Sequence, residues 1–100
     1  MATSVYEPEI MTLDDGTEIT MKPLKIIRLR KFMKVFGRLT GETDDDKQMD
    51  TLTECVILSL GQWNPEIANK KYIEDNFDIN NYYDAIKAAA GIDMRSQGNA

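Results

Sequence analysis

The chain has 100 residues, of which 42% are hydrophobic and 29% charged, and its formal net charge is −5. This length and composition predict one folded domain with a single modest core. No apolar run approaches the roughly 20 residues that cross a bilayer. The N-terminus, MATSVYEPEI, lacks a basic region followed by an apolar one, as a secretory signal would have. We therefore expect no membrane span and a cytoplasmic location.

The residue types present argue against catalysis. The sequence contains no histidine, which is the commonest general base and the commonest transition-metal ligand in proteins. Its single cysteine, Cys55, lies in the apolar run ECVILSL and is expected to be a buried core thiol. Residues 44–50 alternate oxygen-bearing side chains as a calcium loop does, but the glycine and the distal glutamate of that motif are absent. We predict no enzyme, no cofactor and no metal site.

The first expected element is a β-hairpin over residues 9–22. Apolar and polar residues alternate on both sides of the turn signal DDG at 14–16. Glycine tolerates a positive φ angle there, and aspartate bonds to nearby backbone. Two strands alone are barely stable in water, so the hairpin is expected to pack on a helix. The residues expected to share one face are Ile10, Ile19 and Met21.

A helix over about residues 24–39 is expected to carry most of the positive charge. Between Lys22 and Arg38 the sequence has seven basic residues and no acidic one. At about 100° per residue, six apolar side chains fall within an arc of about 140°, which we expect to face the core. These six are Ile26, Leu29, Phe32, Met33, Phe36 and Leu39. Ile27 and Val35 are left among the charged side chains of the opposite arc.

Three further helices are expected, the first of them preceded by an acidic cap and apolar around most of its circumference. They span about 46–62, 65–76 and 79–90. We expect the first to be the central, most buried helix, and Asp78 and Gly91 to begin and end the last one. The prediction is a mostly helical α+β fold, in which an N-terminal hairpin packs on about four short helices. It forms a single domain over residues 1–93, followed by a flexible tail, 94–100.

Several short motifs then occur in a distinctive order. The hairpin exit DDGTEITMKPL spaces Asp15, Gly16, Ile19, Pro23 and Leu24, and the basic helix LKIIRLRKFMKVF follows directly. Near the end, YIEDNFDI leads into a helix that closes with AAGI. In this order, over about residues 10–93, the chain resembles the tail assembly chaperones of bacteriophages with long, non-contractile tails.

The resemblance implies a non-enzymatic role in virion morphogenesis. Such chaperones bind the tape measure protein, a long and largely helical chain, keep it soluble and help to recruit the major tail tube protein. The resemblance further implies action in the host cell cytoplasm and absence from the mature virion. Binding along a helix is physically reasonable, because a small protein with exposed apolar surface can cover an apolar stripe reversibly. Self-association is a further expectation.

Candidate partner-binding residues follow from the surplus of apolar surface and from the basic face, not from a family motif. They are Ile27, Arg28, Lys31, Lys34, Val35, Arg38 and Trp63. One alternative is a nucleic-acid-binding accessory protein that uses the basic helix 22–38 to neutralise phosphates. The acidic net charge and the absence of aromatic residues on the basic face weigh against nucleic acid. A structural tail connector or terminator subunit, and a merely solvated basic face, stay open as alternatives.

Overall fold

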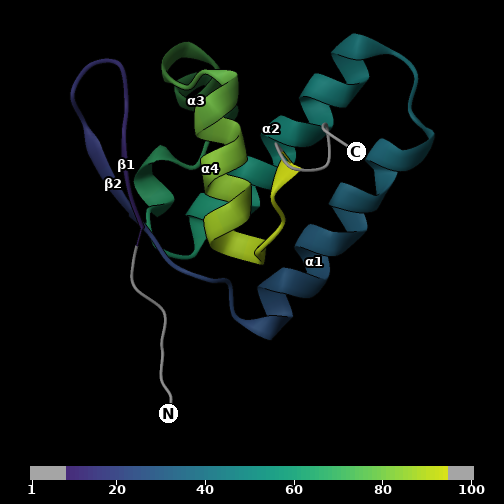
Figure 1. The fold of residues 1–100 in the computed structure, drawn as a ribbon, viewed down its shortest axis with the longest axis horizontal. Coiled ribbons are helices and arrows are strands. Elements are labelled where there is room, and N and C mark those ends of the chain that lie inside the picture. The colour runs from purple at the N-terminus through teal and green to yellow at the C-terminus, as the bar shows by residue number, and fades with distance from the viewer. Residues whose placement is uncertain (1–8, 95–100) are drawn as a thin grey trace.

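A computed structural model describes residues 9–94. A β-hairpin and four α-helices follow one another along the chain, in the mostly helical α+β fold that the sequence predicts. Their bounds are β1 (Glu9–Thr12), β2 (Glu18–Met21), α1 (Ile26–Phe36), α2 (Asp45–Gly61), α3 (Lys70–Asn76) and α4 (Ile79–Ala90). The hairpin lies along one side of the molecule, α4 crosses in front of α2, and α1 extends along the opposite side (Figure 1). No described helix is long and apolar enough to cross a membrane.

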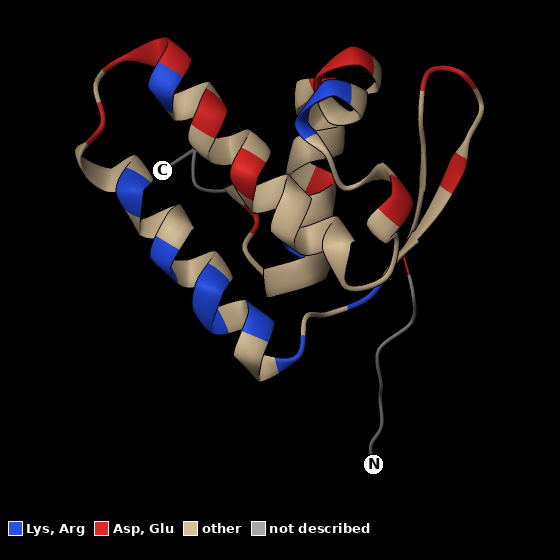
Figure 2. Cartoon of the chain, turned by 180° about the vertical axis from the view of Figure 1, so that it is seen from behind, with Lys and Arg blue, Asp and Glu red and all other residues tan. Residues whose placement is uncertain are grey.

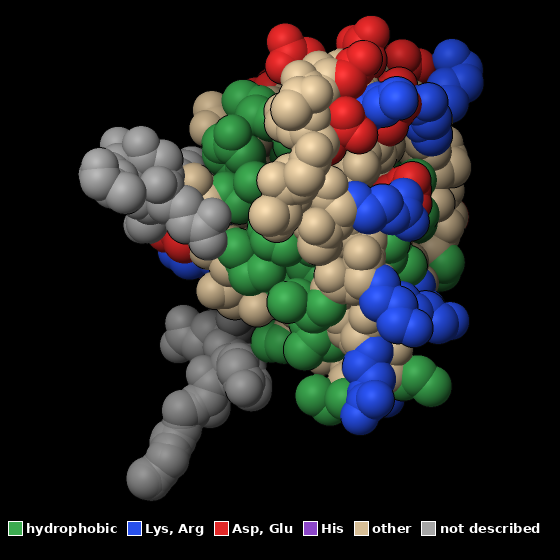
Figure 3. Space-filling model, turned by 90° about the vertical axis from the view of Figure 1, so that its right-hand side faces the viewer, with side chains coloured by type: hydrophobic (Ala, Val, Ile, Leu, Met, Phe, Trp, Pro, Cys, Tyr) green, Lys and Arg blue, Asp and Glu red, His purple; other side chains and the backbone are tan. Residues whose placement is uncertain are grey.

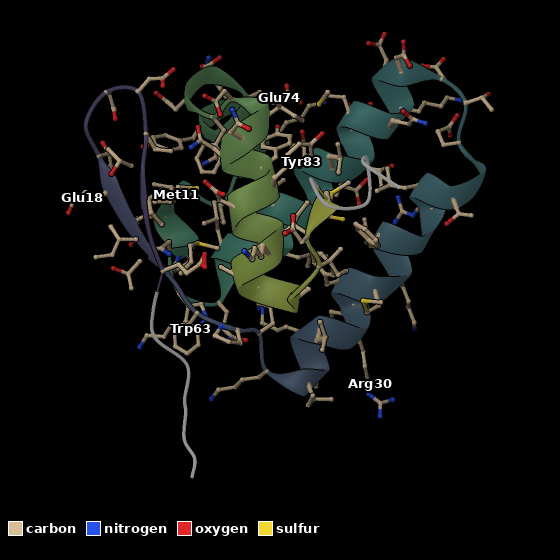
Figure 4. All side chains as sticks on the ribbon, in the orientation of Figure 1. Met11, Glu18, Arg30, Trp63, Glu74 and Tyr83 are labelled. Carbon is tan, nitrogen blue, oxygen red and sulfur yellow. The ribbon has the colours of Figure 1, made fainter. Side chains whose placement is uncertain are left out.

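The hairpin buries one face and exposes the other. In the antiparallel register, Met11 lies opposite Ile19, and Ile10 lies opposite Thr20. Directly opposed residues share a face, so the expectation that Ile10 lies on the same face as Ile19 was wrong by one residue. Ile10 is 66% exposed. The buried face consists of Met11, Leu13, Ile19 and Met21, and Figure 4 shows Met11 between the hairpin and α4.

The hairpin turn follows the chemistry of its residues. Gly16 has a φ angle of 90°, which glycine adopts at little cost. The Asp15 carboxylate accepts a hydrogen bond from the Thr17 backbone N–H at 2.9 Å, and this bond lowers the pKa of Asp15. The Leu13 N–H donates to the Thr17 carbonyl at 2.8 Å. These local bonds fix the strand register that buries Met11 opposite Ile19.

Helix α2 is the central helix, as predicted, and α1, α3 and α4 all pack on it. It begins at the N-cap Asp44, whose carboxylate accepts from the backbone N–H groups of Asp46 and Lys47 at 2.8 and 3.2 Å. Carboxylates here also complement the positive end of the helix dipole. Its fully buried residues are Thr53, Cys55, Val56, Ser59 and Leu60. The Ser59 hydroxyl donates to the Cys55 carbonyl at 2.8 Å, which allows a polar side chain in the core.

Two predicted helices differ from those observed. The single helix expected over 65–76 was wrong, because a short 3₁₀ turn (Pro65–Ile67) ends before α3 begins at Lys70. Asn69 is extended there, and its side chain accepts from the Tyr72 N–H at 2.8 Å, so it caps a new helix instead of continuing the old one. The basic helix, expected to reach residue 39, changes at Phe36 into a 3₁₀ segment (Gly37–Gly41).

Helix α4 begins and ends where the sequence predicts. Asp78 and Asn81 form a reciprocal capping box with both bonds at 2.9 Å, and Gly91 ends the helix in the left-handed conformation. The Leu24 N–H donates to the Ala89 carbonyl at 2.9 Å and ties the entry of α1 to the end of α4. Met94 packs against the core, so the predicted tail does not begin there. The rest of that tail, 95–100, and residues 1–8 lie outside the described residues.

Candidate functional site

Helix α1 is rotated relative to its apolar arc. Phe32 is fully buried against α2, but Ile26 and Met33, which were expected in the core, are 65% and 49% exposed. Arg28 and Val35, expected on the open basic face, are instead half-buried. The side of α1 that packs therefore lies closer to Arg28 and Val35 than the apolar pattern predicts. Two large apolar side chains are left in solvent as a result.

Five residues of α1 line a shallow groove of about 350 Å³, which we call the α1 face. It consists of Ile26, Leu29, Arg30, Met33 and Lys34. Apolar side chains on this side of the molecule lie beside a column of basic ones (Figure 3). Arg30 points away from the body of the protein (Figure 4). The arrangement suits a partner with an apolar stripe and acidic flanks, because the groove supplies contact area and its rim supplies positive charge.

A larger cleft adjoins the α1 face. It has a volume of about 530 Å³ and lies between the hairpin exit, the start of α1 and the end of α4. Ile26 and Leu29 line both hollows. The wall that α4 contributes is formed largely by small residues, Ala88 to Gly91. Apolar surface is therefore continuous from the end of α4 to Met33, which is longer than the α1 face alone.

Some of the partner-binding residues predicted on α1 are exposed, and others pack within the fold. Ile27 is 71% exposed, and Lys31 and Lys34 are exposed on the same helix. Arg38, beyond the end of α1, forms an exposed ion pair with Glu54 of α2 at 3.3 Å. Figure 2 shows basic residues along α1 and acidic residues on the neighbouring helix α2. The free positive charge is therefore concentrated on α1 itself.

The expectation that Arg28 and Val35 lie on the open face was wrong. Val35 packs against the core cluster. The Arg28 guanidinium lies over the end of α2, since a Cβ added to Gly61 would be 2.6 Å from Arg28 Nη2. The Nε atom of Arg28 is buried and has no hydrogen-bond partner among the described residues. Gly61 thus leaves room for an arginine that helps to set the position of α1 on α2.

Trp63 lies apart from the α1 face. It follows the end of α2 near the base of the hairpin (Figure 4) and is partly exposed, as the sequence predicts. The Lys22 ammonium lies 5.0 Å from the centroid of its ring, in a cation–π contact. The neighbouring Asn64 amide donates to the Thr20 carbonyl at 3.2 Å and holds this junction against β2. These contacts give Trp63 a structural role in the fold, separate from the other candidates.

Sequence reasoning missed a second surface, which we call the acidic groove. It has a volume of about 530 Å³ and lies between the first half of α2, the end of α3 and the start of α4. Its lining consists of Asp46, Met49, Asp50, Glu74, Phe77, Asp78, Ile79 and Tyr82. Met49 and Ile79 are exposed large apolar side chains. The available signal was the spacing of Asp46, Met49 and Asp50, which places acidic and apolar side chains on one side of α2.

A polar network that is buried at Thr53 and Tyr82 and reaches the exposed Glu74 lies at the acidic groove. The Tyr82 hydroxyl lies 2.6 Å from Thr53 Oγ1, and Thr53 donates to Glu74 at 3.3 Å. If Thr53 donates to Glu74, the Tyr82 hydroxyl is the donor of the shorter bond. Burial raises the pKa of Tyr82, so this hydroxyl stays protonated at neutral pH. The network is a fixed base for the groove and contains no reactive nucleophile.

The thiol of the single cysteine is buried. Cys55 is fully buried, as predicted, and burial raises the pKa of its thiol to about 12, with a smaller contribution from the Glu54 charge. A thiol in this state is not a nucleophile near neutral pH. Within residues 9–94, no three His, Cys, Asp or Glu side chains are grouped to hold a metal ion.

A comparison of the chain with models of known protein families, with curated proteins and with solved structures finds no match.

Proposed function

We propose that this protein is a non-enzymatic chaperone of bacteriophage tail assembly. It binds the tape measure protein, keeps that long chain soluble and helps to recruit tail tube subunits. The observation that carries the proposal is the α1 face, where Ile26 and Met33 are exposed beside Arg30 and Lys34. The order of motifs from the hairpin exit to AAGI supports the same family of functions.

The protein acts by covering the apolar stripe of its partner reversibly. A long helix that is later enclosed in a tube must keep its apolar stripe out of water until then. The apolar side chains of the α1 face cover part of such a stripe, and the rim cations pair with acidic residues beside it. Each contact is small and therefore weak, but many copies bound along one chain act together. Release then requires only competition from tube subunits, in the host cytoplasm and before the particle is complete.

The basic row on α1 also raises nucleic-acid binding as a second candidate. Arg30, Lys31 and Lys34 are exposed on α1 and would meet phosphates. Two of the basic residues counted in the sequence are used within the fold, because Arg38 pairs with Glu54 and Arg28 lies over the end of α2. The acidic residues of α2 lie beside this row (Figure 2) and would repel a polyanion. Protein binding is therefore the better supported function.

The test is co-purification. The tagged chain is expressed with the neighbouring reading frames of its own genome, treated with nuclease and recovered, and bound proteins are identified by mass spectrometry. We expect a long helical protein with several copies of the chaperone on each molecule. Recovery of nuclease-sensitive material that salt removes, without a long protein, would contradict the proposal and favour the nucleic-acid alternative.

A further inference from the structure

The α1 face and the acidic groove are chemically complementary. The α1 face presents Ile26 and Met33 with cations at its rim. The acidic groove presents Met49 and Ile79, which are also exposed, with carboxylates at its rim. Among residues 9–94, no lysine or arginine lines the acidic groove, and no aspartate or glutamate lines the α1 face. Each surface therefore carries the charge and the apolar contacts that the other requires.

One copy of the chain cannot join its own two surfaces. In Figure 4, Glu74 of the acidic groove lies at the top of the molecule and Arg30 of the α1 face at the lower right, well apart from it. Helix α1 is held against α2 by buried Phe32, and the Leu24 N–H bond to the Ala89 carbonyl fixes its N-terminal end. Moving α1 to the groove would break this packing. Any contact between the two surfaces must therefore join different molecules.

We propose that the α1 face of one copy docks in the acidic groove of a second copy. Ile26 and Met33 pack against Met49 and Ile79, while Arg30 and Lys34 lie beside the carboxylates of the groove rim. The two docking surfaces are different, so the contact is heterologous and leaves one free surface at each end. Association then proceeds head to tail and does not stop at a dimer unless the geometry closes a ring.

Charge favours a second copy as the occupant. The segment Lys22–Arg38 contains seven of the twelve basic residues of the chain, and the net charge is −5. Of the chain's own surfaces, α1 is thus the one that can meet the acidic groove with a concentration of opposite charge. In the groove, Asp50 has only an exposed contact with Lys70 at 3.7 Å, so its charge remains largely available.

Self-docking occupies the surface that the proposed function assigns to the tape measure protein. A second copy and the tape measure protein would therefore compete for the α1 face, an inference that rests on that proposed function. The face would stay covered until a partner with acidic flanks displaces the groove of the second copy. Free copies would be stored with less exposed apolar surface, which reduces nonspecific aggregation. Because the area is small, the self-contact is weak and exchanges readily.

Sedimentation velocity over a range of protein concentrations tests the proposal. We expect the wild-type sedimentation coefficient to rise continuously with concentration and to pass the value of a dimer. Arg30→Glu on the α1 face and Asp50→Lys in the groove should each weaken association at least about tenfold. Both side chains are exposed, so thermal melts should match the wild type. If either variant fails to fold, Lys34→Glu or Asp46→Lys replaces it.

Matched controls and a rescue separate this contact from general charge effects. Lys71→Glu and Glu18→Lys make the same charge reversals at residues that line neither surface and should associate as the wild type does. Combining Arg30→Glu with Asp50→Lys in one chain makes the altered surfaces complementary again and should restore part of the association. A wild type that stays monomeric, or an Arg30→Glu variant that behaves as Lys71→Glu does, would overturn the proposal. If the chain is monomeric but still recovers a long helical partner, the self-docking proposal fails and the proposed function stands. If the chain self-associates but recovers no partner, only the proposed function is contradicted.

Discussion

At the residue scale, Ile27 and Val35 occupy similar positions in the helical pattern but differ in exposure. Ile27 and Val35 both lie among basic residues in the helical pattern, but Ile27 is 71% exposed whereas Val35 packs against the core. We expect Val35→Asp to lower the free energy of unfolding by about 2 kcal/mol, because it brings a carboxylate into an apolar contact. Ile27→Asp should stay within about 0.5 kcal/mol of the wild type. Urea denaturation of both variants checks this, and equal effects would contradict the placement of Val35.

The buried thiol makes stability depend on alkaline pH. Burial raises the pKa of Cys55 from 9.0 to about 12, so the unfolded chain ionises first as the pH rises. Below pH 9 the thiol is protonated in both the folded and the unfolded chain, so Cys55 does not make the free energy of unfolding depend on pH. Between pH 9 and about 12 the free energy of unfolding should fall, by up to about 1.4 kcal/mol for each pH unit. Denaturation curves of the wild type and Cys55→Ala across this window compare the slopes, which should be shallower in the variant.

At the scale of elements, α4 depends on its N-terminal cap. Asp78→Ala removes one half of the capping box with Asn81 and should lower the free energy of unfolding by about 1 kcal/mol. Asp78→Asn keeps an acceptor at the cap and should lose only a fraction of that. Thermal unfolding of the two variants provides the measurement. Equal losses would show that the carboxylate charge, and not the hydrogen bond to the Asn81 N–H, stabilises the helix start.

The elements that follow from local chemistry could be predicted from the sequence. The caps Asp44 and Asp78, the turn glycine Gly16 and the terminating Gly91 all act where their residue types indicate. The break at Asn69 was missed, although asparagine favours the N-cap as strongly as aspartate does. An apolar pattern spanning the break looked like one helix, and only the side-chain bond to the Tyr72 N–H divides it.

The docking surfaces could be predicted only in part, for a tertiary reason. Helical periodicity locates an apolar arc but not the exact side of it that meets a neighbouring helix. On α1, Arg28 fits over Gly61 and Val35 joins the core, and this rotation exposes Ile26 and Met33. The acidic groove combines residues from three helices that are up to 36 positions apart, Asp46 and Tyr82 being the extremes. No local pattern reports such a combination.

At the scale of the whole molecule, the fold holds two unlike surfaces apart. Helix α2 separates the basic α1 face from the acidic groove, and both surfaces include exposed apolar side chains. We propose that the α1 face binds a helical partner and that the acidic groove binds the α1 face of another copy. The proposed function depends on the α1 face.

The most direct test of partner binding by the α1 face compares two isoleucines of equal exposure. Ile26 on the α1 face and Ile10 on the outer face of the hairpin are 65% and 66% exposed. Each is changed to aspartate, and the amount of long helical partner that co-purifies with each variant is measured against the wild type. We expect Ile26→Asp to lose at least about tenfold in recovered partner, since it places a charge in the apolar contact, and Ile10→Asp to retain it. Equal recovery by the two variants would contradict the assignment of the α1 face as the binding surface.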